Sequence, residues 1–524
     1  MIASRRSVML GAAGLVAAPR LGRAQAGRPL RFVPQADLAV LDPVFTTATV
    51  TLTHGFMVFD TLYALDEGYN VRPQMAEGHV VERDGLDWTI TLREGLKFHD
   101  GEPVRGRDCV ASINRWAARD MVGAELIAVL DEMSAPTDRT IRIRLKRPFP
   151  LLPRALGKVT AAMPAIMPER IAATPPNRQV TEMVGSGPYR FLADERLAGV
   201  RVAYARFDGY VPRNEPSSRT AGGKRAFIDR VEWQILPDPA TAAGALMAGE
   251  VDWLEYPSTD LAPMLRRNRD VTVAVTDERS ISVLRFNHLH PPFNNPGVRR
   301  ALIGALDQSA YMTAAFGDDR ALWREVGVFL SGTPMASDAG MAALRGPRDM
   351  DKVKRDLAAA GYAGEKVVLL QANDFALLKA LSEVSADMMT RAGMTVDVVG
   401  ADWGTIGARR ASKEPVERGG WSVFTSGFSG AGMLDPVAHL GLRANGAGAW
   451  FGWPDSPQLE ALRRDWMAAP DTAQQQAVAR AIQERFWIDL PYLPLGEYSR
   501  MTAYRSTITD IPVGLPSFWG VRRV

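Results

Sequence analysis

The chain has one cysteine among its 524 residues, Cys109, and a single thiol cannot form an internal disulfide. After residue 26 it also lacks any run of the roughly 18 consecutive apolar residues that a membrane-spanning helix needs. These absences exclude disulfide-stapled and membrane-spanning proteins, and the 46% hydrophobic content is that of an ordinary soluble globular chain. The helical spacing around Cys109 predicts a small core residue. At roughly 100–200 residues per domain, the length predicts about three domains.

An excess of charge of one sign is missing too. The formal net charge is +3, but four arginines stand within the first 26 residues, which contain no acidic residue. Without that segment the net charge falls by four, to −1. Nucleic-acid-binding proteins carry a basic surface excess. The sequence therefore predicts no nucleic-acid partner.

Motifs of catalysis are also absent. Residues 427–431 (GFSGA) lack the final glycine of a nucleophile elbow, and residues 222–224 (GGK) lack the first glycine of a phosphate-binding loop. His288 and His290 could supply two metal ligands, but no cysteine or acid nearby completes a set. The alternative for this pair is a solvent-facing loop in front of two prolines. We therefore expect no enzyme activity, no cofactor and no metal site.

The first 26 residues contain the three regions of an export signal in the correct order. Two arginines at positions 5 and 6 precede an apolar run over residues 8–18, and residues 24–26 (AQA) match an A-x-A cleavage pattern. As a helix this run is about 16 Å long, half of the ~30 Å membrane core, so it is too short for a permanent anchor. The arginine pair favours twin-arginine export and a periplasmic mature chain that starts near Gly27. The alternative is a disordered basic N-terminus.

Strands alternate with helices from residue 30 onward, without an obvious repeat. Period-two alternation predicts strands at residues 88–93 and 141–146. Asp238 before a proline predicts the start of a helix, and Gly249 predicts its end before a short strand. A polar insertion at residues 212–224 predicts a surface loop.

The second half has longer units of the same kind. Helices are expected near residues 298–306, 350–360, 375–392, 459–467 and 472–487, and strands near residues 367–370, 395–399 and 423–425. This order predicts an α/β protein with mixed sheets covered by helices. Residues 490–524 are expected to return to an earlier domain, because Phe518 and Trp519 would otherwise expose apolar surface.

Several segments occur in an order that resembles the extracytoplasmic solute-binding proteins of family 5, the dipeptide, oligopeptide and nickel receptors of ABC importers. The most informative segment is residues 85–104 (GLDWTITLREGLKFHDGEPV). Further matching segments are residues 41–43, 60–63, 73–77, 108–113, 185–189, 228–231, 245–252, 287–293, 298–302, 358–362 and 490–494. Each segment alone is weak, but their order along nearly the whole mature chain is specific to the family.

The resemblance implies a two-lobed periplasmic-binding-protein fold of type II, in the three-domain form of peptide receptors. The expected divisions are an export signal (1–26), a discontinuous lobe I (27–60, 180–278 and 490–524), an extra subdomain of lobe I (61–179) and lobe II (279–489). The implied function is capture of a peptide or other small organic solute between the lobes by a monomer, and delivery to ABC permease subunits in the inner membrane. The alternative is a periplasmic sensory or chaperone-like protein without a dedicated permease.

The pocket is where this sequence departs from the family. Peptide receptors of this type place an aspartate a few residues before an Asp-Pro pair, and it binds the ammonium group of the ligand. Asp435 and Pro436 match that pair, but Ala431 or Gly432 occupies the place of the acid. A buried ammonium without a carboxylate is unfavourable. Binding of a free peptide N-terminus is therefore in doubt, unless another acid such as Asp402 replaces the missing one.

The remaining candidate ligand contacts surround this segment. Aromatic walls and polar contacts are expected from Trp403, Trp421, Phe424, Phe428, Ser426, Ser429 and the exposed backbone of Gly427. Thr47, Asp402 and Asp435 complete the predicted set. The alternative for Trp421 and Phe424 is that they are core residues of lobe II.

Overall fold

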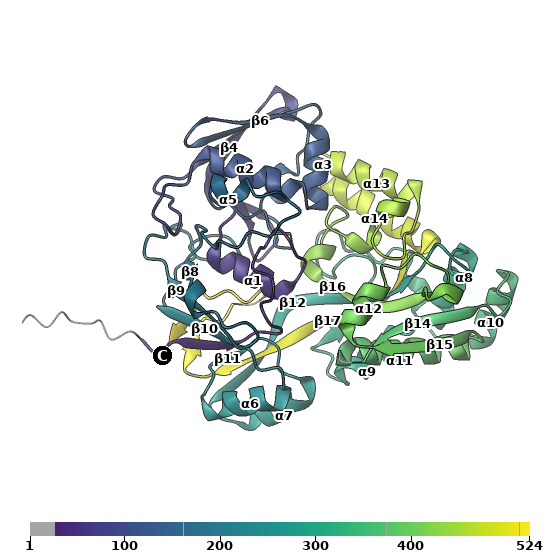
Figure 1. Ribbon diagram of the computed structural model, residues 1–524. Coiled ribbons are helices and arrows are strands. Elements are labelled where there is room, and N and C mark those ends of the chain that lie inside the picture. Colours follow the sequence, from purple (N-terminus) through teal and green to yellow (C-terminus); the bar gives the residue numbers. More distant parts are fainter. Residues whose placement is uncertain (1–26, 161, 374, 513) are drawn as a thin grey trace, which may run out of the picture.

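The computed structural model of the chain describes residues 27–524, except residues 161, 374 and 513. The predicted export signal at residues 1–26 lies outside the described part. Figure 1 shows two lobes joined by the long strands β12 (Val271–Phe286) and β17 (Tyr492–Arg505). Within the described residues, no helix combines the length and the apolar character needed to cross a membrane.

One mixed sheet runs through both lobes. Its described strands lie in the order β15 (Thr395–Ala401), β14 (Lys366–Ala372), β16 (Val423–Ser429), β12, β17, β11 (Trp253–Leu254), β1 (Leu30–Val33), β10 (Arg230–Gln234), β9 (Arg201–Arg206) and β8 (Tyr189–Phe191), with β13 (Trp323–Arg324) paired to β17. We call the half with β1 and β8–β11 lobe I, and the half with β14–β16 lobe II. Parallel pairs form within each half, whereas β12 and β17 are antiparallel. The predicted α/β architecture with a mixed sheet is confirmed.

A second, four-stranded sheet forms a unit of its own above lobe I in Figure 1. Its order is β4 (Ala76–Glu82), β5 (Asp87–Leu92), β7 (Thr140–Leu145) and β6 (Leu130–Thr137). Every second residue of β7 is buried, including Ile141 and Ile143, as the period-two pattern predicts. Cys109 is fully buried in the helix packed on this sheet, which confirms its prediction as a core residue. We call this part the small-sheet unit.

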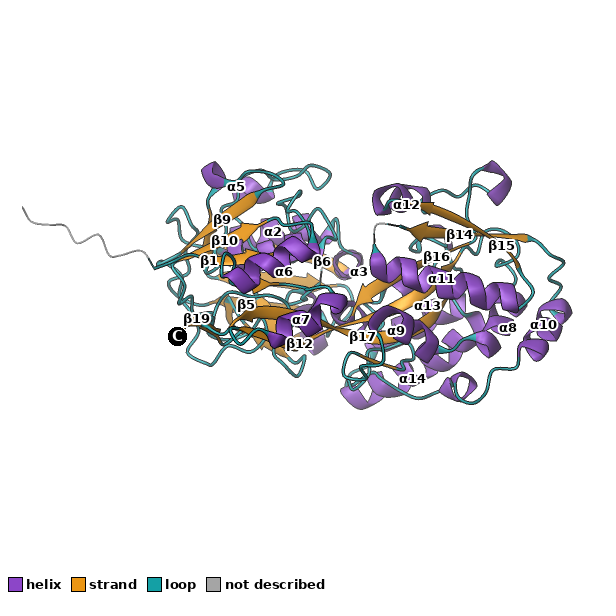
Figure 2. Ribbon diagram, turned by 90° about the horizontal axis from the view of Figure 1, so that it is seen from below, coloured by secondary structure: helices purple, strands orange, loops and turns teal. Residues whose placement is uncertain are grey.

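Helices cover the faces of both sheets (Figures 1 and 2). They are α1 (Thr49–Val58), α2 (Gly106–Ala117), α3 (Met121–Val129), α4 (Leu152–Ala155), α5 (Glu169–Ala172), α6 (Pro239–Ala248), α7 (Ala262–Arg267), α8 (Pro296–Ala301), α9 (Gln308–Phe316), α10 (Met350–Ala359), α11 (Ala376–Arg391), α12 (Trp403–Arg409), α13 (Pro457–Ala468) and α14 (Thr472–Asp489). The predicted cap of α6 is confirmed: the Asp238 carboxylate accepts a hydrogen bond from the Thr241 amide, and Gly249 ends the helix with φ of 74°. Two antiparallel pairs of short strands complete the described strands: β2 (Tyr63–Leu65) with β3 (Val71–Pro73), and β18 (Ile508–Thr509) with β19 (Arg522–Arg523).

Strands β12 and β17 pass lengthwise from one lobe to the other. The first part of β12 pairs with β17 beside lobe I, and its last part lies between β17 and β16 in lobe II. The register of the β12–β17 ladder is interrupted between Val275 and Arg279, at the passage between the lobes. A register interruption weakens the ladder locally. A second interruption follows between Ser282 and Val283, so the ladder that joins the lobes is irregular at two points.

The C-terminal segment returns to lobe I, as predicted. The Phe518 ring lies 5.1 Å from the Phe32 ring of β1, centroid to centroid, and both side chains are buried. Near the end of the chain, Arg523 Nη2 lies 3.0 Å from Asp252 Oδ2, just before β11. Residues from both ends of the chain thus form the same core.

Candidate functional site

A pocket lies between the lobes and is lined from both of them. Its cavity volume is about 80 Å³. Lobe I and the small-sheet unit contribute Thr47, Thr49, Leu52, Tyr69, Val159, Thr160, Arg219, Thr220 and Leu515, and the other wall consists of Arg279, Ser429 and Ala431. Ligand pockets typically measure roughly 300–1,000 Å³. The lobes are therefore close together in this conformation.

The lining of this pocket is polar and carries guanidinium groups. Arg219 donates a hydrogen bond to the Tyr69 hydroxyl (3.1 Å), and its guanidinium carbon lies 4.3 Å from the centre of the Tyr69 ring. Arg279 Nη1 lies 3.0 Å from Glu497 Oε1 and also donates to the Ser331 carbonyl (2.6 Å). A guanidinium has five N–H donors. The described wall thus offers hydroxyls and N–H donors to the acceptors of a ligand.

A second, smaller cavity of about 30 Å³ adjoins the first. The two cavities share Val159, Thr160 and Ala431 as lining residues. Across it, Leu434 and Val437 of lobe II face Leu151 and Val122 of the small-sheet unit. Ala431, one of the two residues that the family resemblance predicts at the position of the ammonium-binding acid, therefore lies where the lobes meet.

The polar segment 212–224 contributes Arg219 and Thr220 to the pocket wall. Its prediction as a surface loop is wrong for its last five residues, which are all buried. Thr220 lies beside β2, where its hydroxyl accepts a hydrogen bond from the Leu65 amide (3.1 Å) and donates one to the Leu65 carbonyl (3.3 Å). The end of the segment is therefore part of the core of lobe I, and no local pattern of residues indicated this burial.

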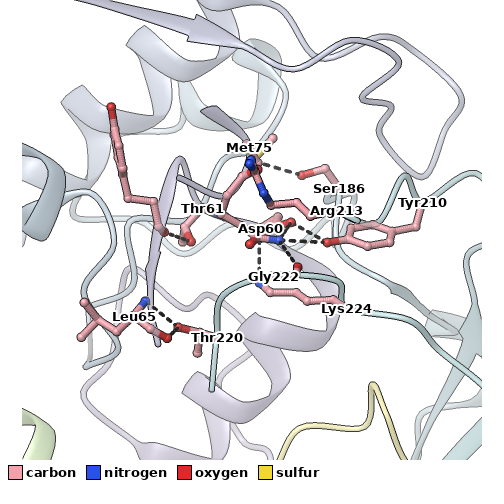
Figure 3. A network of polar contacts seen from close by, with 12 residues as sticks. Asp60, Thr61, Leu65, Met75, Ser186, Tyr210, Arg213, Thr220, Gly222 and Lys224 are labelled. Atoms are coloured by element: carbon pink, nitrogen blue, oxygen red, sulfur yellow. Dashed lines mark hydrogen bonds and ion pairs between the residues drawn. The ribbon is translucent and has the colours of Figure 1, made fainter. Parts of the chain in front are cut away.

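A buried ion pair holds the end of this segment in place (Figure 3). Lys224 Nζ lies 2.7 Å from Asp60 Oδ1, and the two side chains are 0% and 1% exposed. Asp60 Oδ2 accepts hydrogen bonds from the Tyr210 hydroxyl (2.9 Å) and from the Gln74 amide (3.5 Å), and that amide also donates to the Gly222 carbonyl (3.3 Å). Burial of its hydroxyl, together with the Asp60 carboxylate, raises the pKa of Tyr210 well above its ordinary value. The network joins residues that are distant in sequence and fixes one wall of the pocket.

Three of the predicted site residues lie at these cavities. Thr47 and Ser429 line the larger cavity from opposite lobes, and Asp435 lines the smaller one. The Asp435 carboxylate is 4% exposed and accepts hydrogen bonds from the Val437 and Ala438 amides through Oδ1. Its Oδ2 atom accepts from Arg154.

The predicted aromatic walls lie elsewhere. Trp421 and Phe424 are fully buried and pack against each other with ring centroids 5.0 Å apart, so they occupy the core of lobe II, which is the alternative that the sequence left open. Phe428 is half-buried against Trp450, and Ser426 is buried in β16. Gly427 is exposed on the same strand. A side chain at this position would bring its Cβ to 3.1 Å from the Tyr498 hydroxyl. None of these five predicted residues is among the described residues that line the two cavities.

Asp402 and Trp403 stand at the start of α12. Asp402 is exposed and caps the helix, and its carboxylate accepts hydrogen bonds from the amide and the hydroxyl of Thr405. These two hydrogen bonds lower the pKa of Asp402. Trp403 is half-buried beside Phe375 and Arg410. Neither residue is among the described residues that line the two cavities.

The histidine pair has backbone partners. His288 Nε2 lies 3.2 Å from the Pro491 carbonyl oxygen, and His290 Nε2 lies 2.8 Å from that of Lys413. Within the part of the chain that the structure describes, no group of three His, Cys, Asp or Glu side chains is arranged to hold a metal ion.

Sequence reasoning missed most of the wall on the side of lobe I. Tyr69, Thr160 and Arg219 belong to separate loops that only the tertiary fold brings together. The predicted contacts centred on the segment around Ala431, which is one continuous stretch, and on the opposite wall they included Thr47 alone.

Two α/β lobes with a polar pocket between them are the architecture of solute-binding proteins, and the fold and the site of this chain are of that class. The family model for bacterial extracellular solute-binding proteins, family 5, matches residues 70–449. The chain therefore belongs to this family, as its motifs predicted.

Curated relatives resemble it over their whole length. The probable peptide ABC transporter periplasmic-binding protein y4tO of Sinorhizobium fredii is 36% identical, and the match covers 100% of both chains. The glutathione-binding protein GsiB of Pectobacterium atrosepticum is 24% identical over 96% of this chain and 95% of its own.

Solved structures share the fold. The binding protein AgaA of A. tumefaciens R10, in complex with agropinic acid, has a TM-score of 0.78 at 21% identity and covers 95% of this chain and 99% of its own. A dipeptide-binding protein of Pseudoalteromonas, in complex with Met-Leu, has a TM-score of 0.78 at 18% identity and covers 95% and 100%. The predicted two-lobed, type II fold is thereby confirmed.

Proposed function

We propose that this chain is the periplasmic substrate-binding component of an ABC importer, which captures a peptide or another small organic solute between its lobes. The single observation that carries the proposal is the pocket whose walls come from both lobes, with Thr47 on one side and Ser429 on the other. A ligand in such a pocket contacts both walls only when the lobes are closed, so its binding favours the closed form. The closed, loaded form is then presented to permease subunits in the inner membrane. Family membership supports this function over a sensory or chaperone-like one.

The chemistry of the ligand follows from the position of Ala431. This alanine lines both cavities, and an aspartate there would face any ligand in the pocket. The related proteins are named for binding peptides or glutathione, and one structural neighbour is in complex with agropinic acid, so the family accepts varied organic solutes. We propose a ligand from this class that presents carboxylate or carbonyl oxygens to the donors of the pocket and has no free ammonium group at Ala431.

The organisation of the chain is proposed with the predicted boundaries. Residues 1–26 act as a twin-arginine export signal, and residues 27–60, 180–278 and 490–524 form lobe I. Residues 61–179 form its extra subdomain, and residues 279–489 form lobe II. The grouping of β1 and β8–β11 in one half of the sheet and β14–β16 in the other supports this division. The mature protein acts as a monomer, because one chain supplies both walls of the pocket.

Identification of the bound solute tests the function. The protein is purified from the periplasm, denatured, and the released small molecules are identified by mass spectrometry. The identified compound, added back at a hundredfold excess over Kd, is expected to stabilise the fold by about 2.7 kcal/mol and to raise the melting temperature. Recovery of the compound unchanged after incubation is the expected result for a receptor. A chemically altered compound would contradict a purely binding function.

A further inference from the structure

Arg154 of the small-sheet unit and Asp435 of lobe II form an ion pair across the cleft. Arg154 Nε and Nη2 each lie 2.7 Å from Asp435 Oδ2, and the two residues are 281 positions apart in the sequence. The aspartate side chain is 5% exposed and the arginine side chain 29%. The sequence suggested Asp435 as a ligand contact. In the structure its Oδ1 atom is occupied by two backbone amides and its Oδ2 atom by Arg154.

A second pair connects the same two parts of the molecule. Arg443 Nη1 lies 3.3 Å from Glu125 Oε1 of α3, and Arg443 Nε lies 3.6 Å from Glu460 Oε2 of α13. Figure 1 shows α3 of the small-sheet unit beside α13 of lobe II. Beside the Arg154–Asp435 pair, apolar side chains of the two parts, among them Leu434 and Leu151, line the same small cavity and form an apolar seam. The small-sheet unit and lobe II thus make polar and apolar contacts of their own, independent of any ligand.

These contacts differ from the two strands that join the lobes, because they depend on the conformation. Strands β12 and β17 join the lobes covalently in every conformation, whereas the Arg154–Asp435 pair and the apolar seam exist only when the lobes are close. Contacts present in one conformation alone shift the equilibrium toward it. An ion pair that is partly buried is also less screened by water and salt than an exposed one.

We propose that Arg154 and Asp435 are positioning residues that latch the small-sheet unit to lobe II and populate the closed form before ligand binds. The pair seats residues 430–438 against Thr160 and so completes the pocket wall that carries Ala431. The latch lowers the conformational cost of ligand binding, because part of the closing free energy comes from contacts within the protein. This inference rests on the proposed two-lobed function, but its test requires no ligand.

The test measures the distance between the lobes in the full mature protein. Cys109 is the single cysteine and is fully buried, so introduced surface cysteines are labelled selectively. Glu94→Cys in the small-sheet unit and Asp351→Cys in lobe II offer positions whose native side chains are both 82% exposed. Bound solute is removed by unfolding and refolding, and the distribution of distances is recorded by energy transfer together with the radius of gyration from small-angle scattering.

Three variants are compared in this background. Asp435→Asn keeps an oxygen for the two backbone amides and removes the charge, and Arg154→Gln removes the partner. Arg144→Gln is the matched control, because Arg144 pairs with Asp131 inside the small-sheet unit and not across the cleft. Melting temperatures show whether each variant is folded.

We expect a large closed population in the unliganded parent protein. Asp435→Asn and Arg154→Gln should each raise the ratio of open to closed molecules roughly fivefold, which corresponds to about 1 kcal/mol, and the double variant should go no further than either single one. Arg144→Gln should leave the distribution unchanged. A parent distribution that is entirely open, or variants that match the parent, would overturn the latch. Weaker solute binding by Asp435→Asn with an unchanged distance distribution would also overturn the latch. It would show that Asp435 contacts the ligand.

Discussion

Lys224 Nζ lies 2.7 Å from Asp60 Oδ1 in lobe I, and 164 residues of sequence separate the two groups. The lysine also lies under the Trp519 ring, 5.0 Å from its centre. Both charges are buried, so each depends on the other to offset its lost hydration. The pair joins the end of α1, the segment 212–224 and the C-terminal segment, and thereby fixes the wall that carries Thr220.

Removal of one partner of this pair should be costly. Lys224→Met leaves the Asp60 carboxylate buried without its cation, and we expect a loss of about 3–5 kcal/mol in the free energy of unfolding. The matched control is Arg206→Met, whose exposed pairs with Asp208 and Asp229 should contribute at most about 1 kcal/mol. Urea unfolding followed by circular dichroism measures both. Equal losses in the two variants would contradict a structural role for the buried pair.

The missing acid in the pocket leads to a prediction on specificity. We expect the natural protein to bind free dipeptides and tripeptides poorly and their N-acetylated forms better, because no carboxylate stands at Ala431 to pair with an ammonium group. Ala431→Asp should reverse this preference and improve the affinity for free peptides at least tenfold, since a hydrogen bond to a charged group contributes about 1.5–3 kcal/mol. Ala431→Asn, of the same size without the charge, is the control. Calorimetric titration with the peptide panel gives the affinities.

Two outcomes would contradict this account of the pocket. One is tight binding of free peptides by the natural protein, with rejection of the acetylated forms. The other is a change of affinity in Asp402→Asn. Asp402 caps α12 and is not among the described lining residues, so we expect this variant to bind every peptide as the natural protein does. A loss of peptide binding in Asp402→Asn would show that Asp402 contacts the ligand.

His439 gives a pH dependence of stability with a defined sign. Burial lowers its pKa to about 4, and its Nδ1 atom accepts a hydrogen bond from the Leu442 amide, which a protonated ring could not do. The unfolded chain therefore binds more protons than the folded one between about pH 6.5 and pH 4, and stability decreases as the pH falls through this range. From pH 7 to pH 5 the contribution of this single group is a loss of about 2 kcal/mol.

The variant His439→Asn isolates this contribution. It keeps an oxygen that can accept from Leu442 and removes the titrating ring, so its stability should fall less steeply with decreasing pH than that of the natural protein. Other buried histidines, such as His54 and His99, titrate in both proteins and cancel in the comparison. Free energies of unfolding at pH 7, 6 and 5 provide the two curves. Parallel curves would show that His439 does not contribute.

Export can be tested with two conservative changes. General secretion requires only positive charge near the N-terminus, whereas twin-arginine export requires the arginines themselves. Arg5→Lys with Arg6→Lys should therefore abolish the periplasmic form, and N-terminal sequencing of the natural form should begin near Gly27. A normal periplasmic yield of the double variant would exclude the twin-arginine route.

The fold was predictable where its signals are local. Strands β5 and β7 have a period of two along a few residues, and α6 begins at Asp238 and ends at Gly249, so neighbouring residues alone specify these elements. Helices α10, α11, α13 and α14 begin at or within two residues of their predicted positions for the same reason.

The pocket was not predictable to the same degree, because its chemistry depends on distant partners. Lys224 was predicted to lie in a surface loop. Its charge can be buried because the Asp60 carboxylate, which is distant in the sequence, pairs with it. Trp421 precedes β16 and Phe424 lies within it. The first four residues of β16 are all buried, so both faces of the strand are covered there and an apolar residue carries no information about a ligand. Ser429 and Ala431, at the end of the same strand and just beyond it, are the residues that reach the cleft.

The position of β17 in the large sheet has a consequence for biosynthesis. This strand lies between β12 and β11, so until it is in place the sheet exists as two separate halves. Because β17 spans Tyr492–Arg505 and β11 ends at Leu254, the ribosome has to add more than 230 residues after β11 before the halves can be united. Lobe II has β14–β16 and most of its helices complete by then, whereas β11 still lacks β17 as its second neighbour. The nascent chain therefore has to keep the edge of β11 unpaired and free of wrong partners until β17 has been synthesised, and the two lobes are joined into one sheet only after that.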